Sequence, residues 1–189
     1  MCSNSIGTNI ANAFKVVSET CESVGQLLSF LNQKAKENNE YIPLTEKPLM
    51  RLKNDVFNDE YILVFQRKKD RKSLYVLDVS LWNNENGNDK PDEAKIYISK
   101  FEYDKSFNLN NFPISKGDFY LFADPICEDV TDLQYDGNSY SGTVNAKVQA
   151  ENEYRGLQRV VGFSVPLVNI NADNAEEKVF GGFHALIEK

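Results

Sequence analysis

Cysteine and histidine are scarce in this chain, which limits the chemistry available to it. Of its 189 residues, three are cysteine and one is histidine. Cys2, Cys21 and Cys127 are too few, too scattered and odd in number for a disulfide framework or a zinc site. We therefore predict a protein without a metal or other cofactor, in a reducing, cytoplasmic environment.

Long apolar runs are also missing. The longest apolar-rich run, Val160–Val168, is interrupted by Ser164 and Pro166. It is far shorter than the roughly 20 residues that span a bilayer. Residues 1–8 have neither the basic start nor the apolar core of a signal peptide. The sequence therefore predicts no contact with a membrane.

Positive charge is in deficit, and motifs for nucleophilic catalysis are lacking. The 21 basic residues face 28 acidic ones, a net charge of −7, which argues against nucleic acid as a partner. The one basic cluster, Arg67–Lys72, could contact phosphate, but we favour the interpretation that it is the charged, soluble tip of a hairpin. Without a Gly-x-Ser-x-Gly elbow or a Gly-rich phosphate loop, His184 is interpreted as a packed or edge histidine.

One long amphipathic pattern stands near the start of the chain. Between residues 10 and 36, apolar side chains recur alternately four and three residues apart, which places them on one stripe of an α-helix. The stripe comprises Ile10, Phe14, Val17, Cys21, Val24, Leu28, Leu31 and Ala35. We predict a helix to about Glu37, with Thr8 or Asn9 as its N-cap. Residues 1–9 are expected to fray.

The rest of the chain is typical of strands. Two apolar runs rich in β-branched and aromatic residues, Tyr61–Phe65 and Leu74–Trp82, predict a hairpin. Residues 49–52 fit either a strand or a short helical turn. Further strands are predicted at Ala94–Tyr103, Asp118–Ala123, Val144–Val148, Arg159–Ile170 and Val179–Ile187.

These elements together define the expected fold. Connections are short, and strands do not alternate with helices after residue 60, so a parallel, doubly wound sheet is disfavoured. We predict a single α+β domain over residues 1–189. In it, the long N-terminal amphipathic helix packs on a curved, mostly antiparallel sheet of about seven strands.

The helical stripe fits two kinds of packing. Its spacing is a regular heptad, as in a coiled coil that joins two chains, but its flanking positions lack the opposite charges that set strand pairing there. Ala13 and Leu27 widen the stripe, which suits packing on a sheet. We therefore favour burial against the chain's own sheet, with Val24 and Leu28 in the core. A homo-oligomer through this helix is the alternative to a monomer.

Asp78, Glu93 and Lys95 resemble the residue pattern of a metal-dependent phosphodiesterase. Such centres place one carboxylate on a strand and Glu-x-Lys on the next, so that the carboxylates hold Mg²⁺ and the lysine stabilises charge at the phosphate. Here Glu93 and Lys95 precede the apolar run instead of lying inside it, and solvated charges at a strand edge are the simpler interpretation.

An acidic stretch follows in the second half of the chain. It contains Asp124, Glu128, Asp129, Asp132 and Asp136. Oxygen ligands at alternating positions are typical of a calcium loop, but the closing position is Thr143 in place of a bidentate Glu. We therefore predict no metal site here, and either a solvated acidic loop or a negative surface suited to a basic protein partner.

These observations favour one function and leave two alternatives. The leading hypothesis is a non-enzymatic, intracellular module that binds another protein through an acidic surface or a face of the helix. One alternative is a metal-dependent enzyme acting on nucleic acid or nucleotide through Asp78, Glu93 and Lys95. The other is a small-ligand binder, since nine tyrosines and twelve phenylalanines could line a pocket in a curved sheet.

Overall fold

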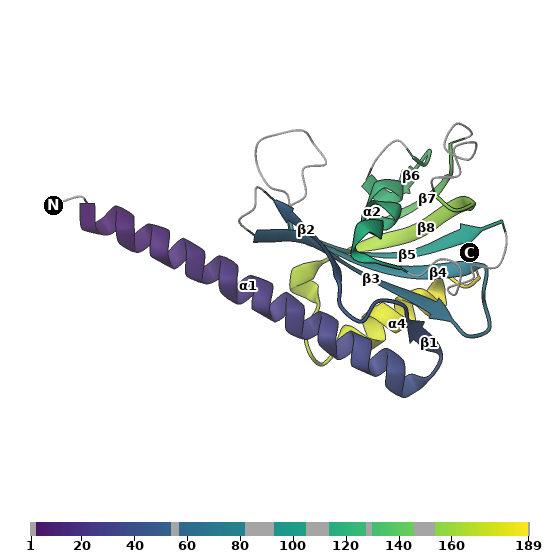
Figure 1. Cartoon of the computed structure of the whole chain (residues 1–189), viewed down its shortest axis with the longest axis horizontal. Coiled ribbons are helices and arrows are strands. Elements are labelled where there is room, and N and C mark those ends of the chain that lie inside the picture. The colour runs from purple at the N-terminus through teal and green to yellow at the C-terminus, as the bar shows by residue number, and fades with distance from the viewer. Residues whose placement is uncertain are drawn as a thin grey trace.

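The computed structural model describes residues 3–53, 57–81, 93–104, 114–127, 130–145 and 154–188. It confirms the α+β fold, with a long N-terminal helix packed on an open antiparallel sheet (Figure 1). The helices are α1 (Ser3–Asn38), α2 (Tyr120–Cys127) and α4 (Ala175–Ala185), with 3₁₀ turns η1 (Lys116–Asp118) and η2 (Leu167–Asn169). The strands are β1 (Tyr41–Pro43), β2 (Leu49–Lys53), β3 (Phe57–Arg67), β4 (Ser73–Ser80), β5 (Lys95–Tyr103), β6 (Gln134–Asp136), β7 (Ser139–Thr143) and β8 (Leu157–Pro166).

The sheet is built around the three consecutive strands β3, β4 and β5. Its strand order is β1-β3-β4-β5-β8-β7-β6, and β2 also pairs with β3. The register places Asp78 of β4 opposite both Ile62 of β3 and Tyr97 of β5. Because directly opposed residues point to the same face of a sheet, these three side chains share one face.

Most of the predicted strands are confirmed. The hairpin at residues 61–82 corresponds to β3 and β4, and the strand predicted at 94–103 is β5. Residues 49–52 lie in a strand, and the strand predicted at 159–170 ends at Pro166. Only the first part of the strand predicted at 144–148 is described, where Val144 forms an isolated bridge with Thr131.

One face of the sheet is covered by the second half of α1 and by α4 (Figure 1). Val24 and Leu28 are 3% and 1% exposed, which confirms the prediction that they lie in the core. Beside them, aromatic rings from β1, β4 and α4 contact one another. The ring centroids of Tyr41 and Tyr75, and those of Tyr75 and Phe183, are 5.3 Å apart, a distance at which edge-to-face contacts are favourable.

The C-terminal segment is α4, so the strand predicted at residues 179–187 is wrong. Val179 and Phe183 lie four residues apart and are fully buried, which is the spacing of one helical face. Glycine at position 182 allows this helix to pack closely. A Cβ at Gly182 would lie 2.9 Å from Cζ of Phe163 on β8, so glycine lets α4 approach the sheet.

The opposite face of the sheet is covered by η1 and α2, and the strand predicted at residues 118–123 is therefore also wrong. Phe122 and Ile126 of α2 are four residues apart, 1% and 2% exposed, and pack in the second core. Just before them, Ser115 donates its backbone N–H to Asp118 Oδ2 at 2.7 Å, which fixes a turn. A short apolar run does not by itself distinguish a buried helix from a strand.

The first half of α1 extends beyond the sheet (Figure 1). The helix begins at Ser3, so the N-cap predicted at Thr8 or Asn9 is wrong. Its 36 residues span about 54 Å at 1.5 Å per residue, and every residue from 7 to 20 is exposed. The helix ends at Asn38, and Asn39 has a φ of 60°, the left-handed conformation that commonly follows a helix.

Candidate interaction surface

The apolar stripe of α1 divides into a buried part and an exposed part. Leu28 and Leu31 are 1% and 0% exposed, whereas Ile10, Phe14 and Val17 are 53%, 62% and 38% exposed. The pattern of the sequence is the same in both parts, but the sheet lies only under the second. An exposed apolar row of this kind on a surface helix indicates a contact site. We call Ile10, Phe14 and Val17 the exposed stripe.

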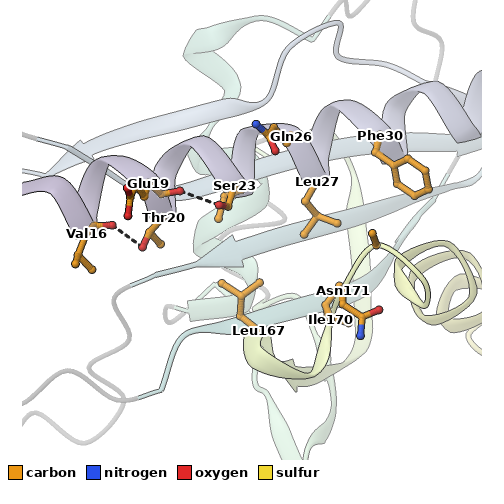
Figure 2. Close-up of a pocket in the computed structure, with 12 residues that line it drawn as sticks. Val16, Glu19, Thr20, Ser23, Gln26, Leu27, Phe30, Leu167, Ile170 and Asn171 are labelled. Atoms are coloured by element: carbon orange, nitrogen blue, oxygen red, sulfur yellow. Dashed lines mark hydrogen bonds between the residues drawn. The ribbon is translucent and has the colours of Figure 1, made fainter.

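A groove runs beside this helix, between α1 and the segment that links β8 to α4 (Figure 2). Its volume is about 620 Å³. Its apolar lining comes from Val16, Val24, Leu27 and Phe30 on α1 and from Leu167, Ile170 and Ala172 on the facing segment. Its polar lining comes from Glu19, Thr20, Ser23, Gln26 and Asn171.

Two hydroxyl groups in the groove are already satisfied within α1. Thr20 Oγ1 donates to the carbonyl of Val16, and Ser23 Oγ donates to the carbonyl of Glu19, each at 2.8 Å (Figure 2). Each hydroxyl therefore already donates its proton within the helix, and the side-chain carbons remain to line the groove. The groove is thus more apolar than its residue types indicate.

The exposed half of α1 carries little charge. Residues 3–14 include no acidic or basic side chain. Lys15 and Glu19 are one turn apart, with Nζ 3.7 Å from Oε1, and at this exposure such a pair adds little stability. The surface formed by the exposed stripe and the groove is therefore close to neutral in a chain of net charge −7.

A second feature of interest is a cluster of buried acids on the opposite face of the sheet. Asp59, Glu60 and Asp78 are 1%, 4% and 0% exposed. Arg51 of β2 covers two of them, with Nη2 3.3 Å from Asp59 Oδ2 and 3.0 Å from Glu60 Oε2. Its guanidinium also lies 5.9 Å from the centre of the Phe119 ring, so the arginine is held over the cluster.

The Glu60 and Asp78 carboxyl groups share a site that favours protonation. Burial, together with the negative charge of Glu60, raises the pKa of Asp78 well above its usual range. Burial also raises the pKa of Glu60, against the opposing effect of Arg51. Neither carboxylate oxygen of Asp78 has a hydrogen-bond partner among the described residues. Protonation of Asp78 removes one of the two neighbouring negative charges from this buried site.

Asp78, Glu93 and Lys95 occupy different environments. Asp78 is sealed inside the sheet, whereas Glu93 is exposed and precedes β5. Lys95 opens β5 opposite Ser80. Within the described residues, no three acidic, histidine or cysteine side chains form a group that could hold a metal ion. The acidic residues near Asp78 are Glu60 and Asp59. The sequence pattern had paired Asp78 with Glu93 and Lys95 instead.

The predicted acidic surface is spread over several elements. Asp124 lies in α2 and accepts a hydrogen bond from Tyr154 Oη at 3.0 Å. Asp132 precedes β6 and Asp136 ends it, and both are exposed. Glu128 and Asp129 lie outside the described residues. The remaining candidate, His184 on α4, has Nε2 3.2 Å from Glu40 Oε2.

Sequence reasoning missed several residues of both sites. Asp59 and Glu60 directly precede the apolar run of β3, and this position was a signal that two acids enter the sheet. Leu167 and Ile170, which face α1 across the groove, were assigned to a strand. Pro166, which ends β8, was the signal that the chain turns there.

Comparisons with protein-family models, with curated proteins and with solved structures found no match to this chain. Among the described residues, no helix combines the length and the apolarity that crossing a membrane requires.

Proposed function

We propose that this chain is a non-enzymatic, cytoplasmic protein-interaction module, and that it binds an amphipathic helix of a partner protein. The partner helix lies along the exposed stripe of α1, and the groove lies on the neighbouring face of the same helix. Helices commonly bind in this way, with apolar side chains spaced three and four residues apart entering an apolar groove. The observation that carries the proposal is the continuation of one apolar stripe from the core onto 62%-exposed Phe14.

Several features support binding of a helix over the alternatives. The groove volume of about 620 Å³ is within the range of small-ligand sites, but the groove adjoins an exposed apolar row that a small ligand leaves uncovered. The aromatic residues Tyr41, Tyr75 and Phe183 pack against one another in the core. For the enzymatic alternative, a substrate reaches Asp78, which is 0% exposed, only if the covering residues move.

The proposal predicts that one exposed side chain decides partner binding. Immobilised wild-type protein, Phe14→Glu and Lys15→Gln are compared for proteins captured from a lysate of the native host. Both substitutions lower the net charge by one, but Lys15 lies on the opposite side of the helix from the stripe. We expect Phe14→Glu to lose at least tenfold of the captured partner and Lys15→Gln to retain it. In the captured complex, amide hydrogens of residues 8–20 should become protected from exchange. Equal capture by both variants would contradict the proposal.

A further inference from the structure

The turn between β3 and β4 concentrates positive charge in an acidic chain. Residues 67–72 comprise five basic side chains and one acid, Asp70. We call these residues the basic turn. Four of its bases are exposed, namely Lys68, Lys69, Arg71 and Lys72. Because the whole chain has a net charge of −7, the basic turn is a local region of opposite sign, to which anionic groups are attracted.

Hydrogen bonds fix the backbone of the basic turn on both sides and within it. At its start, the backbone N–H of Lys68 donates to the carbonyl of Glu40 at 3.0 Å. At its end, the backbone N–H of Tyr103 donates to the carbonyl of Lys72 at 2.8 Å. Between them, Asp70 Oδ1 accepts the backbone N–H of Lys72 at 3.0 Å. The one acid thus closes the turn, and a backbone that is already ordered loses less entropy when a partner binds.

The basic turn is only partly neutralised by its neighbours. Arg67 Nε donates to Glu40 Oε1 at 2.9 Å, and Lys68 Nζ donates to Asn39 Oδ1. Three further basic side chains form no ion pair or side-chain hydrogen bond with the described residues: Lys69, Arg71 and Lys72. These three cations are therefore available to a partner.

We propose that the basic turn is a second contact surface, which binds a run of aspartate and glutamate side chains on a partner protein. Arg71 can hold a carboxylate by two parallel hydrogen bonds, and the lysines on either side supply compact positive charges. A single exposed pair of opposite charges contributes little to binding. Several carboxylates in succession are therefore needed, and this is why a run of acids fits the turn better than one acidic residue.

A nucleic acid fits the basic turn less well than an acidic protein segment. Proteins bind single strands by stacking the bases on aromatic rings beside the basic groups. The nearest aromatic residues of the two strands, Phe65 and Tyr75, are 0% exposed and lie in the core. A duplex presents a long row of phosphates, which a chain of net charge −7 repels as a whole. A short acidic segment matches a surface that is one turn wide.

The basic turn lies far from the exposed stripe. It contacts Asn39 and Glu40, directly after α1 ends at Asn38, whereas the stripe ends at Val17. The helix between Val17 and Asn38 is about 32 Å long at 1.5 Å per residue, and the turn lies at the end of the sheet away from the N terminus (Figure 1). The two surfaces can therefore be occupied together, and each is tested separately.

Binding of a fluorescently labelled deca-glutamate peptide to the full chain tests the proposal. We expect binding at about 0.05 M salt that weakens at least tenfold at about 0.5 M, because salt screens exposed charges, and no binding of deca-glutamine. Lys69→Glu combined with Arg71→Glu should weaken binding at least tenfold. Lys47→Glu combined with Lys116→Glu makes the same change in net charge at exposed lysines outside the turn, and should weaken binding less than threefold.

Further variants separate the basic turn from general charge and from the exposed stripe. Lys69→Gln combined with Arg71→Gln removes charge without reversing it, and should give a smaller loss in the same direction. Phe14→Glu should leave the peptide affinity unchanged. Thermal melts check that every variant folds, as expected for exposed side chains. Equal losses in the two charge-reversed pairs would overturn the proposal, as would a wild type that does not bind deca-glutamate. Tighter binding of deca-thymidine or of anionic vesicles than of the peptide would also overturn it.

Discussion

Leu28→Ala should lower the free energy of unfolding by about 2–5 kcal/mol, because it removes a fully packed side chain and leaves a cavity. Leu28 is 1% exposed and lies in the core between α1 and the sheet. Such a loss is a large share of the roughly 5–15 kcal/mol that stabilises a domain. Chemical denaturation of the wild type and the variant measures it directly.

Protein concentration and a matched substitution make this prediction specific. If Leu28 belongs to the core of the monomer, the loss should be the same across a hundredfold dilution. Val17→Ala, on the same stripe but 38% exposed, should change monomer stability by less than about 0.5 kcal/mol. A loss for Leu28→Ala that disappears in the dilute monomer would show that the residue stabilises an oligomer instead.

The second large effect concerns Asp78, for which Asp78→Asn should stabilise the protein at neutral pH. The folded chain binds the Asp78 proton more tightly than the unfolded chain, in which the pKa lies near 3.8. Between 3.8 and the raised pKa of the folded state, unfolding releases a proton, so the free energy of unfolding falls as pH rises. For one proton this slope is at most about 1.4 kcal/mol per pH unit.

Asp78→Asn should remove the part of this slope that belongs to Asp78. An amide does not ionise, and its NH₂ group is a hydrogen-bond donor, as the protonated acid is. Burial also raises the pKa of Glu60. The variant should therefore keep the part of the pH dependence of the unfolding free energy that comes from Glu60. Urea unfolding from pH 4 to pH 8 measures both slopes, with Asp132→Asn as a control at an exposed acid. A slope for Asp78→Asn equal to that of the wild type would show that Asp78 does not hold the proton.

Periodicity predicted the elements whose pattern is long or strictly alternating. The stripe of α1 extends over seven turns, and the β3–β4 hairpin combines two apolar runs with a charged tip, so few other structures fit them. The segments 118–123 and 179–187 were assigned incorrectly because each is short and apolar on more than one side. Their environment decides their structure: α2 and α4 each cover one face of the sheet, and Gly182 fits a helix that packs closely.

The sites were harder to predict than the fold because they depend on what lies under each element. The sequence of α1 shows one continuous stripe, and nothing in it reveals that the sheet ends near Cys21. The buried acids gave a similar difficulty, since Asp78 was singled out but its neighbours Asp59, Glu60 and Arg51 come from strands whose pairing sets the contact. Register, and not composition, brings these groups together.

Hydrogen exchange along α1 in the dilute protein tests the central claim most directly, namely that one helix is half core and half contact surface. An isolated helix shorter than about 12–15 residues is marginally stable in water, so the unsupported residues 8–20 should exchange rapidly. Residues 24–35, which pack on the sheet, should be protected to nearly the level of global unfolding. We expect the boundary between slow and rapid exchange near Cys21. Equal and strong protection of both halves in the dilute monomer would contradict it.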